Sequence, residues 1–170
     1  RSLTRLQTDH VEILLFHGPR AGEYHNLVDR FYPTMEKLRD QGKIGFIGLS
    51  TQYAGEPAQT VANIALKEHP DLWDTIMLKY GILNQAATRE TLPLAIQHNV
   101  GIMNMAAVRV KLPDPELLQE LIREWAKQGS IKHGSLPDEN PLDWLVHDNV
   151  ISVVGAGYKF AADHPAVATV

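Results

Sequence analysis

The chain has 170 residues, of which 44% are hydrophobic and 21% are charged, so its composition is that of an ordinary globular domain. It carries 16 Lys and Arg residues against 20 Asp and Glu residues, and no segment concentrates the positive charge. We therefore expect neither a nucleic acid nor a membrane as partner. The absence of cysteine excludes disulfide bonds, thiolate catalysis and Cys-ligated metal sites.

The absence of cysteine also agrees with a reducing compartment, and no apolar run approaches the roughly 18 residues of a membrane span. Residues 1–5 are not followed by the hydrophobic segment of a signal peptide. We therefore expect a cytoplasmic protein. Because the sequence begins with Arg1 rather than Met, we also expect it to be a piece of a longer protein.

In the first half of the chain, short apolar runs alternate with helical patterns. Val11–His17 is apolar and closed by a Gly-Pro turn, which predicts a buried strand. Apolar residues then recur at helical spacing over 27–38 and predict a helix that ends near Gly42. Ile44–Ser50 is a second expected strand, and the helix expected over 61–66 is stopped by a His-Pro pair.

The same alternation continues in the second half. Thr75–Tyr80 and Val100–Met105 predict strands, with a helix around Leu92 between them. Asp114 precedes a proline and a glutamate, the residues of a helix start, and this helix should end at Gly129.

A polar loop is expected over 130–140, and a helical region in one or two pieces over 141–164. Residues 167–170 look like the start of another strand. The tryptophans lie in or beside helical segments and are expected in the core; they are Trp73, Trp125 and Trp144.

Strands that alternate with helices predict an α/β fold with a parallel sheet. A doubly wound open sheet and a (β/α)8 barrel both fit this pattern. No Gly-x-Gly-x-x-Gly motif follows any expected strand, which weakens the doubly wound alternative. A barrel needs eight strands and about 250 residues, so roughly half of one would be present.

In both architectures the active site lies beyond the carboxyl ends of the strands, which places His17, Ser50, Tyr80 and Met105 there. His17 ends the strand face that would point into a barrel; the alternative is a buried histidine that donates to a backbone carbonyl. Ser50 could serve a site or, with Thr51, cap the following turn. Tyr80 could serve a cofactor or pack under a loop. Glycines before Ser50 would let a backbone or a ligand approach closely.

Metal and serine-nucleophile chemistry find little support. The other histidines show no metal-ligand spacing, and no Gly-x-Ser-x-Gly elbow occurs. A metal-dependent barrel hydrolase would need ligands on strands that this sequence lacks, and it would make no use of Ser50.

The strand ends carry a family resemblance. Ser2-Leu3-x-Arg5-Leu6, followed by an apolar strand that ends in His17-Gly18-Pro19, resembles the segment around the fourth barrel strand of aldo-keto reductases. Residues 38–50 are similar to the family's helix–Gly-Lys-Ile–strand five signature, and 160–167 to the end of the helix before strand eight. The resemblance covers essentially the whole chain.

This resemblance implies a (β/α)8 TIM barrel that is incomplete, with residues 1–170 forming a partial domain from before strand four to the start of strand eight. It implies reduction of an aldehyde or ketone by hydride transfer from NADPH, or less often NADH, with an Asp–Tyr–Lys–His tetrad. The substrate would be a small carbonyl or sugar-like molecule. The Asp, Tyr and Lys would belong to strands one to three, so we expect the fragment alone to be inactive.

Carried over by position, His17 is the tetrad histidine and would stabilise alkoxide charge on the substrate oxygen. Ser50 matches the residue that binds the nicotinamide carboxamide. Met77 stands where many members have a Gln that contacts the carboxamide, and Met105 where many have a Tyr or Trp that stacks on the nicotinamide. Ala106-Ala107-Val108 replaces the usual Ser-Pro-Leu near the pyrophosphate. These departures keep open a non-catalytic barrel that acts as a binding or regulatory subunit.

Overall fold

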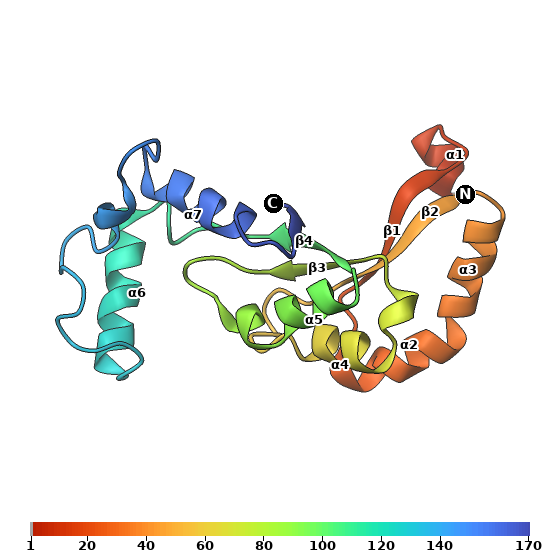
Figure 1. Cartoon of the computed structure of the whole chain (residues 1–170), viewed down its shortest axis with the longest axis horizontal. Helices are drawn as coiled ribbons and strands as arrows, with labels where there is room; N and C mark the ends of the chain where they lie inside the picture. Colours follow the sequence, from red (N-terminus) through yellow and green to blue (C-terminus); the bar gives the residue numbers. More distant parts are fainter. Residues whose placement is uncertain (1) are drawn as a thin grey trace.

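The computed structural model describes residues 2–170 and contains one parallel sheet whose strand order follows the chain, β1-β2-β3-β4-β5 (Figure 1). Each expected strand is present to within one residue at either end. The strands are β1 (Val11–His17), β2 (Ile44–Ser50), β3 (Thr75–Lys79), β4 (Gly101–Met105) and β5 (Val167–Thr169). All four pairings are parallel, so the predicted α/β class is confirmed.

Helices connect the strands. The α-helices are α1 (Ser2–Leu6), α2 (Tyr24–Arg30), α3 (Tyr32–Asp40), α4 (Thr60–Glu68), α5 (Thr91–Gln97), α6 (Pro115–Lys127) and α7 (Val153–Ala162). Short 3-10 helices are η1 (Ala21–Glu23), η2 (Pro70–Leu72), η3 (Ala86–Arg89) and η4 (Asp143–Leu145). Among residues 2–170, no helix is long and apolar enough to cross a membrane.

One helical prediction needed a correction. The single helix expected over 27–38 is two helices that meet at Phe31, because Pro33 in the first turn of α3 has no N–H to continue α2. The region 141–164, expected to be helical in one or two pieces, contains two helical pieces, η4 and α7.

The core lies between the sheet and the helices. Ile47, Leu49, Ile76 and Leu78 are fully buried on this face and pack with apolar residues of α2, α3, α4, α5 and α7. The opposite, concave face is uncovered in the described residues, with Ile13 42% and Phe46 56% exposed. One face of the sheet is therefore a packed core and the other is open.

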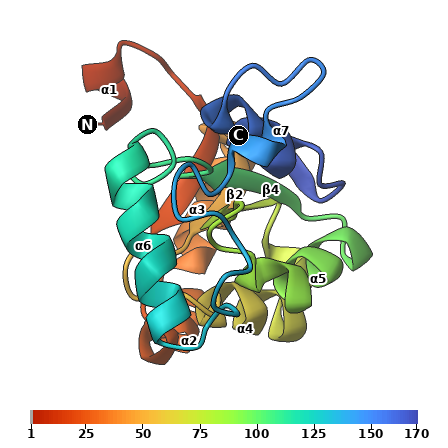
Figure 2. The same cartoon turned by 90° about the vertical axis from the view of Figure 1, so that its left-hand side faces the viewer.

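A second apolar cluster surrounds α6, which lies at one end of the molecule in Figure 1, the end that faces the viewer in Figure 2. Asp114 begins α6 as predicted, since its carboxylate accepts the backbone N–H groups of Glu116 and Leu117 at 3.1 and 3.0 Å. Trp125 is partly buried in this cluster, whereas Trp144 is 63% exposed, so its expected core position was wrong.

Candidate functional site

The carboxyl ends of β1 to β4 surround a hollow of about 670 Å³ on the concave face. In the parallel register His17 lies opposite Ser50, and Ser50 opposite Met77, so the three side chains share a face. Met105, at the end of β4, lines the same hollow. The structure thus places His17, Ser50, Met77 and Met105 around one hollow.

His17 is exposed to this hollow. Within residues 2–170 its imidazole makes no hydrogen bond, so the alternative of a buried histidine tied to a carbonyl is not what the structure contains. The strand end itself is fixed, because the Gly18 N–H donates to the Ser50 carbonyl at 2.7 Å. The backbone that carries His17 is therefore fixed, and its imidazole remains free to donate to a bound molecule.

Ser50 is 4% exposed, and its hydroxyl has no hydrogen-bond partner among the described residues. It does not cap the following turn. Thr51 is the residue that makes the local contacts: its N–H donates to the Met77 carbonyl at 2.8 Å and its hydroxyl to Gln59 Oε1 at 3.4 Å. The Ser50 hydroxyl therefore keeps its hydrogen-bonding capacity for a ligand in the hollow.

Two glutamines that the sequence gave no reason to select hold the loop after β2. Gln52 Nε2 donates to the Gly18 carbonyl at 2.9 Å, which joins this loop to the end of β1. Gln59 is fully buried, and its Nε2 donates to the Lys79 carbonyl at 3.2 Å, which joins the loop to β3. The backbone of Gln59 has a left-handed φ of 57°, an uncommon conformation for a residue with a side chain.

Tyr80 does not line this hollow. Its side chain is 4% exposed and lies against Phe160 and His164, with ring centroids 5.4 and 5.5 Å away. Burial raises the pKa of its hydroxyl. The buried Asn104 accepts the Tyr80 N–H at 2.8 Å and donates to its carbonyl at 2.9 Å. Of the two alternatives for Tyr80, packing is the one observed, and the polar Asn104 inside an apolar strand was the available signal.

Within residues 2–170 no group of three or more His, Asp or Glu side chains could hold a metal ion. The candidate site thus consists of the imidazole of His17, the hydroxyl of Ser50 and the thioethers of Met77 and Met105 around an open hollow.

Comparison with known proteins shows to which family the chain belongs. A family model described as the aldo/keto reductase family matches residues 1–164. The chain belongs to this family. This aldo/keto reductase chain is 29% identical to L-galactose dehydrogenase from Arabidopsis thaliana over 113 residues, which are 65% of the chain and 34% of that protein. It is 27% identical to D-threo-aldose 1-dehydrogenase from a Pseudomonas species over 140 residues, 81% of the chain and 38% of that protein.

Solved structures of the family share the fold. An aldo-keto reductase from Klebsiella pneumoniae, in complex with NADPH, superposes with a TM-score of 0.61 at 20% identity, over 99% of this chain and 50% of that one. Glycerol dehydrogenase from Gluconobacter oxydans gives a TM-score of 0.58 at 18% identity, over 99% and 51% of the two chains. The chain thus spans about half the length of these proteins. The five-stranded parallel sheet fits an incomplete aldo/keto reductase barrel, rather than a doubly wound sheet.

Proposed function

We propose that the complete protein is an NAD(P)H-dependent oxidoreductase that interconverts a carbonyl and an alcohol on a small, sugar-like molecule. On this proposal residues 1–170 run from before strand four to the start of strand eight of its barrel. The observation that carries the proposal is the hollow into which His17 and Ser50 offer unpaired hydrogen-bonding groups, side by side at neighbouring strand ends. The sugar-like substrate rests on the two curated relatives, whose names are those of sugar dehydrogenases.

The role proposed for His17 is to donate a hydrogen bond to the carbonyl oxygen of the substrate. Negative charge develops on this oxygen during reduction, and a donor already fixed in position stabilises that charge without reorganisation. The hydrogen bond from the Gly18 N–H to the Ser50 carbonyl fixes the backbone from which the imidazole reaches the hollow. The proton would come from the tetrad tyrosine, which on this proposal belongs to strands one to three, so the 170-residue chain alone would be inactive.

The residues around Ser50 fit a nicotinamide. NADPH, or NADH, supplies the hydride when it is bound. The Ser50 hydroxyl would hydrogen-bond the carboxamide, and Met77 and Met105 would contact the flat ring by dispersion. A thioether cannot replace both hydrogen-bonding groups of the glutamine amide that many relatives have at the position of Met77. The carboxamide would therefore depend more strongly on Ser50 here.

The same substitutions favour one alternative, a non-catalytic barrel that acts as a binding or regulatory subunit. Met77 and Met105 weaken the polar and stacking contacts that would fix a cofactor for hydride transfer. The histidine retained at the carboxyl end of β1, where it lines the hollow, argues for catalysis.

Replacing His17 by alanine in the complete protein tests the proposal. We expect the turnover of aldehyde reduction to fall by about 10²–10³-fold, the range for one lost oxyanion donor, with little change in cofactor affinity. Turnover is measured by NADPH oxidation and affinity by fluorescence titration. His10→Ala, at the amino end of the same strand region, is the matched control and should leave both unchanged.

Unchanged turnover in His17→Ala would make the histidine structural. A wild-type protein that binds NADPH but reduces no carbonyl would favour the non-catalytic alternative.

A further inference from the structure

The end of β1 is fixed by contacts to its backbone, and one of these contacts comes from a side chain. The Gly18 N–H donates to the Ser50 carbonyl at 2.7 Å, and Gln52 Nε2 donates to the Gly18 carbonyl at 2.9 Å. The strand ladder cannot continue past this point, because Pro19 has no N–H. Gly18 also has a left-handed φ of 60°. The turn that follows His17 is thus held on both sides, and Gln52 provides one of its two bonds.

The Gln52 side chain is itself closely seated. It follows Thr51, whose N–H donates to the Met77 carbonyl of β3 at 2.8 Å. A Cβ at Gly18 would lie 3.4 Å from Gln52 Cγ, so the side chain packs against the Gly18 backbone. A Cβ at Gly55 would lie only 2.8 Å from Gln52 Oε1, so the glycine there leaves room for the amide. The side chain therefore spans from the loop after β2 to the end of β1 with little free space around it.

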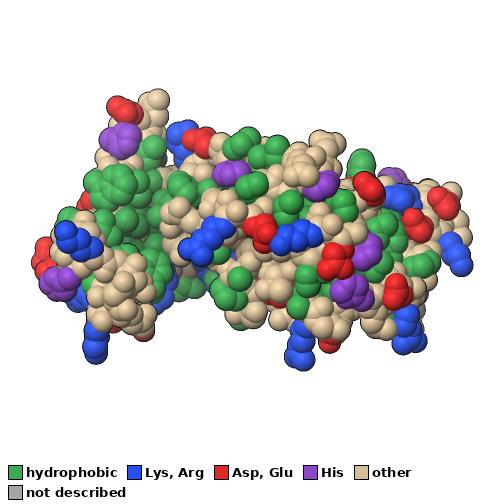
Figure 3. Space-filling model, turned by 60° about the horizontal axis from the view of Figure 1, so that its bottom comes forward, with side chains coloured by type: hydrophobic (Ala, Val, Ile, Leu, Met, Phe, Trp, Pro, Cys, Tyr) green, Lys and Arg blue, Asp and Glu red, His purple; other side chains and the backbone are tan. Residues whose placement is uncertain are grey.

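No charged group of the described residues is available to orient His17 in the hollow. Within residues 2–170 the side chains that line it include no Asp, Glu, Lys or Arg. Charged side chains of both signs are instead spread over the side of the molecule that carries α4 and α5, which Figure 3 turns toward the viewer. A histidine that acts on a substrate is commonly oriented by a hydrogen-bonded neighbour. Among the described residues the imidazole has none, so its position depends on the backbone that carries it.

We propose that Gln52 is a positioning residue, which holds the end of β1 so that the imidazole of His17 meets the substrate oxygen while the nicotinamide lies at Ser50. This inference rests on the function proposed for His17. The Gln52 amide binds the carbonyl of the residue after His17, and its backbone lies two residues beyond Ser50. One side chain thus joins the segments that carry the two groups of the site. Misplacing a reacting group by about 1 Å can lower a rate by as much as about 10²-fold.

Gln52→Met in the complete protein tests the proposal, because methionine keeps the length of the side chain and cannot donate. We expect kcat for aldehyde reduction to fall about tenfold, with KM and the affinity for NADPH changed by less than about twofold. Gly55→Ala keeps the glutamine but crowds its amide, and it should also lower kcat. Gln85→Met is the matched control, since Gln85 Nε2 donates to the Ile82 carbonyl at 3.1 Å in the loop after β3. It loses the same kind of bond away from β1 and should leave kcat unchanged.

The double variant His17→Ala/Gln52→Met shows whether Gln52 acts through the histidine. We expect it to be no slower than His17→Ala alone, because a donor that is absent cannot be misplaced. If Gln52→Met lowers kcat by the same factor with and without His17, the glutamine acts on the fold and not through the imidazole. That result, or an unchanged kcat in Gln52→Met, would overturn the proposal.

An NMR signal of the His17 ring separates this proposal from the proposed function. The signal, assigned by its loss in His17→Ala, should shift or broaden in Gln52→Met and stay unchanged in Gln85→Met. If the wild type reduces no carbonyl but the ring signal responds in this way, the proposed function fails and the positioning of His17 by Gln52 stands. An unchanged ring signal in Gln52→Met overturns the positioning, whatever the activity.

Discussion

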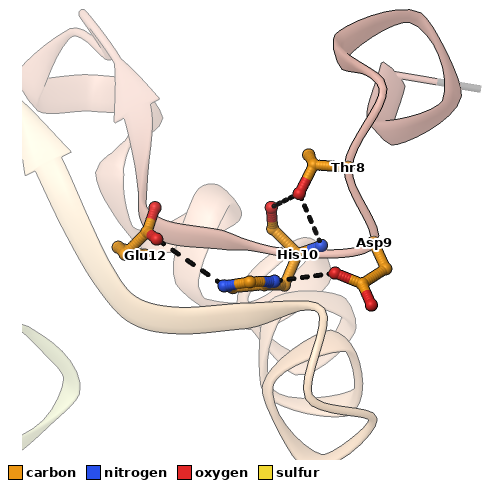
Figure 4. Close-up of polar contacts among 4 residues, drawn as sticks. All are labelled: Thr8, Asp9, His10 and Glu12. Carbon is orange, nitrogen blue, oxygen red and sulfur yellow. Dashed lines mark hydrogen bonds and ion pairs between the residues drawn. The ribbon is translucent and has the colours of Figure 1, made fainter.

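At the scale of single residues, a polar cluster lies at the amino end of β1, the end opposite to the candidate site (Figure 4). His10 Nδ1 lies 2.8 Å from Asp9 Oδ1, and its Nε2 lies 3.6 Å from Glu12 Oε1. The hydrogen bond with Asp9, then its charge, and then the charge of Glu12 raise the pKa of His10. The hydrogen bond with His10 is the largest cause that lowers the pKa of Asp9.

These shifts predict how the cluster responds to pH. A raised folded-state pKa means that the His10 contribution to stability is complete below its ordinary pKa of about 6.5, and is lost as pH rises through the folded-state value. For Asp9, the contribution is present above its ordinary pKa and lost as pH falls through the lowered one. NMR titration of the His10 ring should give a midpoint above about 6.5 that falls toward that value in Asp9→Asn. Glu139→Gln is a control of equal charge change, and an identical midpoint in wild type and Asp9→Asn would contradict the assignment.

The roles of single residues could be predicted where position along a strand decides them. His17 and Ser50 were found from the sequence because parallel strands bring their carboxyl ends to one edge. Gln59 and Asn104 were not, because each acts through a contact with a strand end more than fifteen residues away in the sequence. Such partners follow from the packing of the elements, which no local pattern records.

At the scale of elements, glycines in β2 allow the strands to approach. A Cβ at Gly45 would lie 2.7 Å from the Glu12 carbonyl oxygen in β1. A Cβ at Gly48 would collide with Leu15 Cδ2 and lie 2.7 Å from the Thr75 carbonyl oxygen. The close approach expected from the sequence is thus made by the neighbouring strands, and β2 is tightly packed between β1 and β3.

Gly48→Ala should therefore destabilise the protein by about 1–3 kcal/mol, because an extra carbon in a full space forces its neighbours to shift. Gly22→Ala is the matched control, since a Cβ there has nothing within 4 Å, and it should change stability by less than about 0.5 kcal/mol. The midpoints of urea unfolding measure both effects. Equal stability of the two variants would show that β2 can move away from its neighbours at little cost.

Some helix boundaries can be predicted from nearby residues in the sequence, and others cannot. The start of α6 was predictable because the Asp114 carboxylate binds N–H groups two and three residues ahead. The break at Phe31 follows from one proline, and the apolar spacing concealed it. Trp144 has a large apolar side chain, which predicts a core position. It lies in η4, outside the apolar clusters that surround α6 and the sheet.

At the scale of the whole molecule, the open concave face of the sheet decides whether chains are expected to associate. In a complete barrel this face is filled by layers of inward-pointing side chains from all strands. Here Ile13 and Phe46 are 42% and 56% exposed on it, and β1 offers an unpaired strand edge beside them. Exposed apolar faces and free strand edges are the two surface features that most readily cause association between chains.

The 170-residue chain on its own should therefore self-associate. We expect light scattering to report species larger than a monomer, and Phe46→Lys to shift the distribution toward the monomer by placing a charge on the concave face. Phe31→Lys is the matched control, because Phe31 is similarly exposed, at 52%, but lies on the helical side between α2 and α3. It should leave the association unchanged. A monodisperse wild-type monomer, or an equal effect of the two substitutions, would show that the concave face is not the surface through which the chains associate.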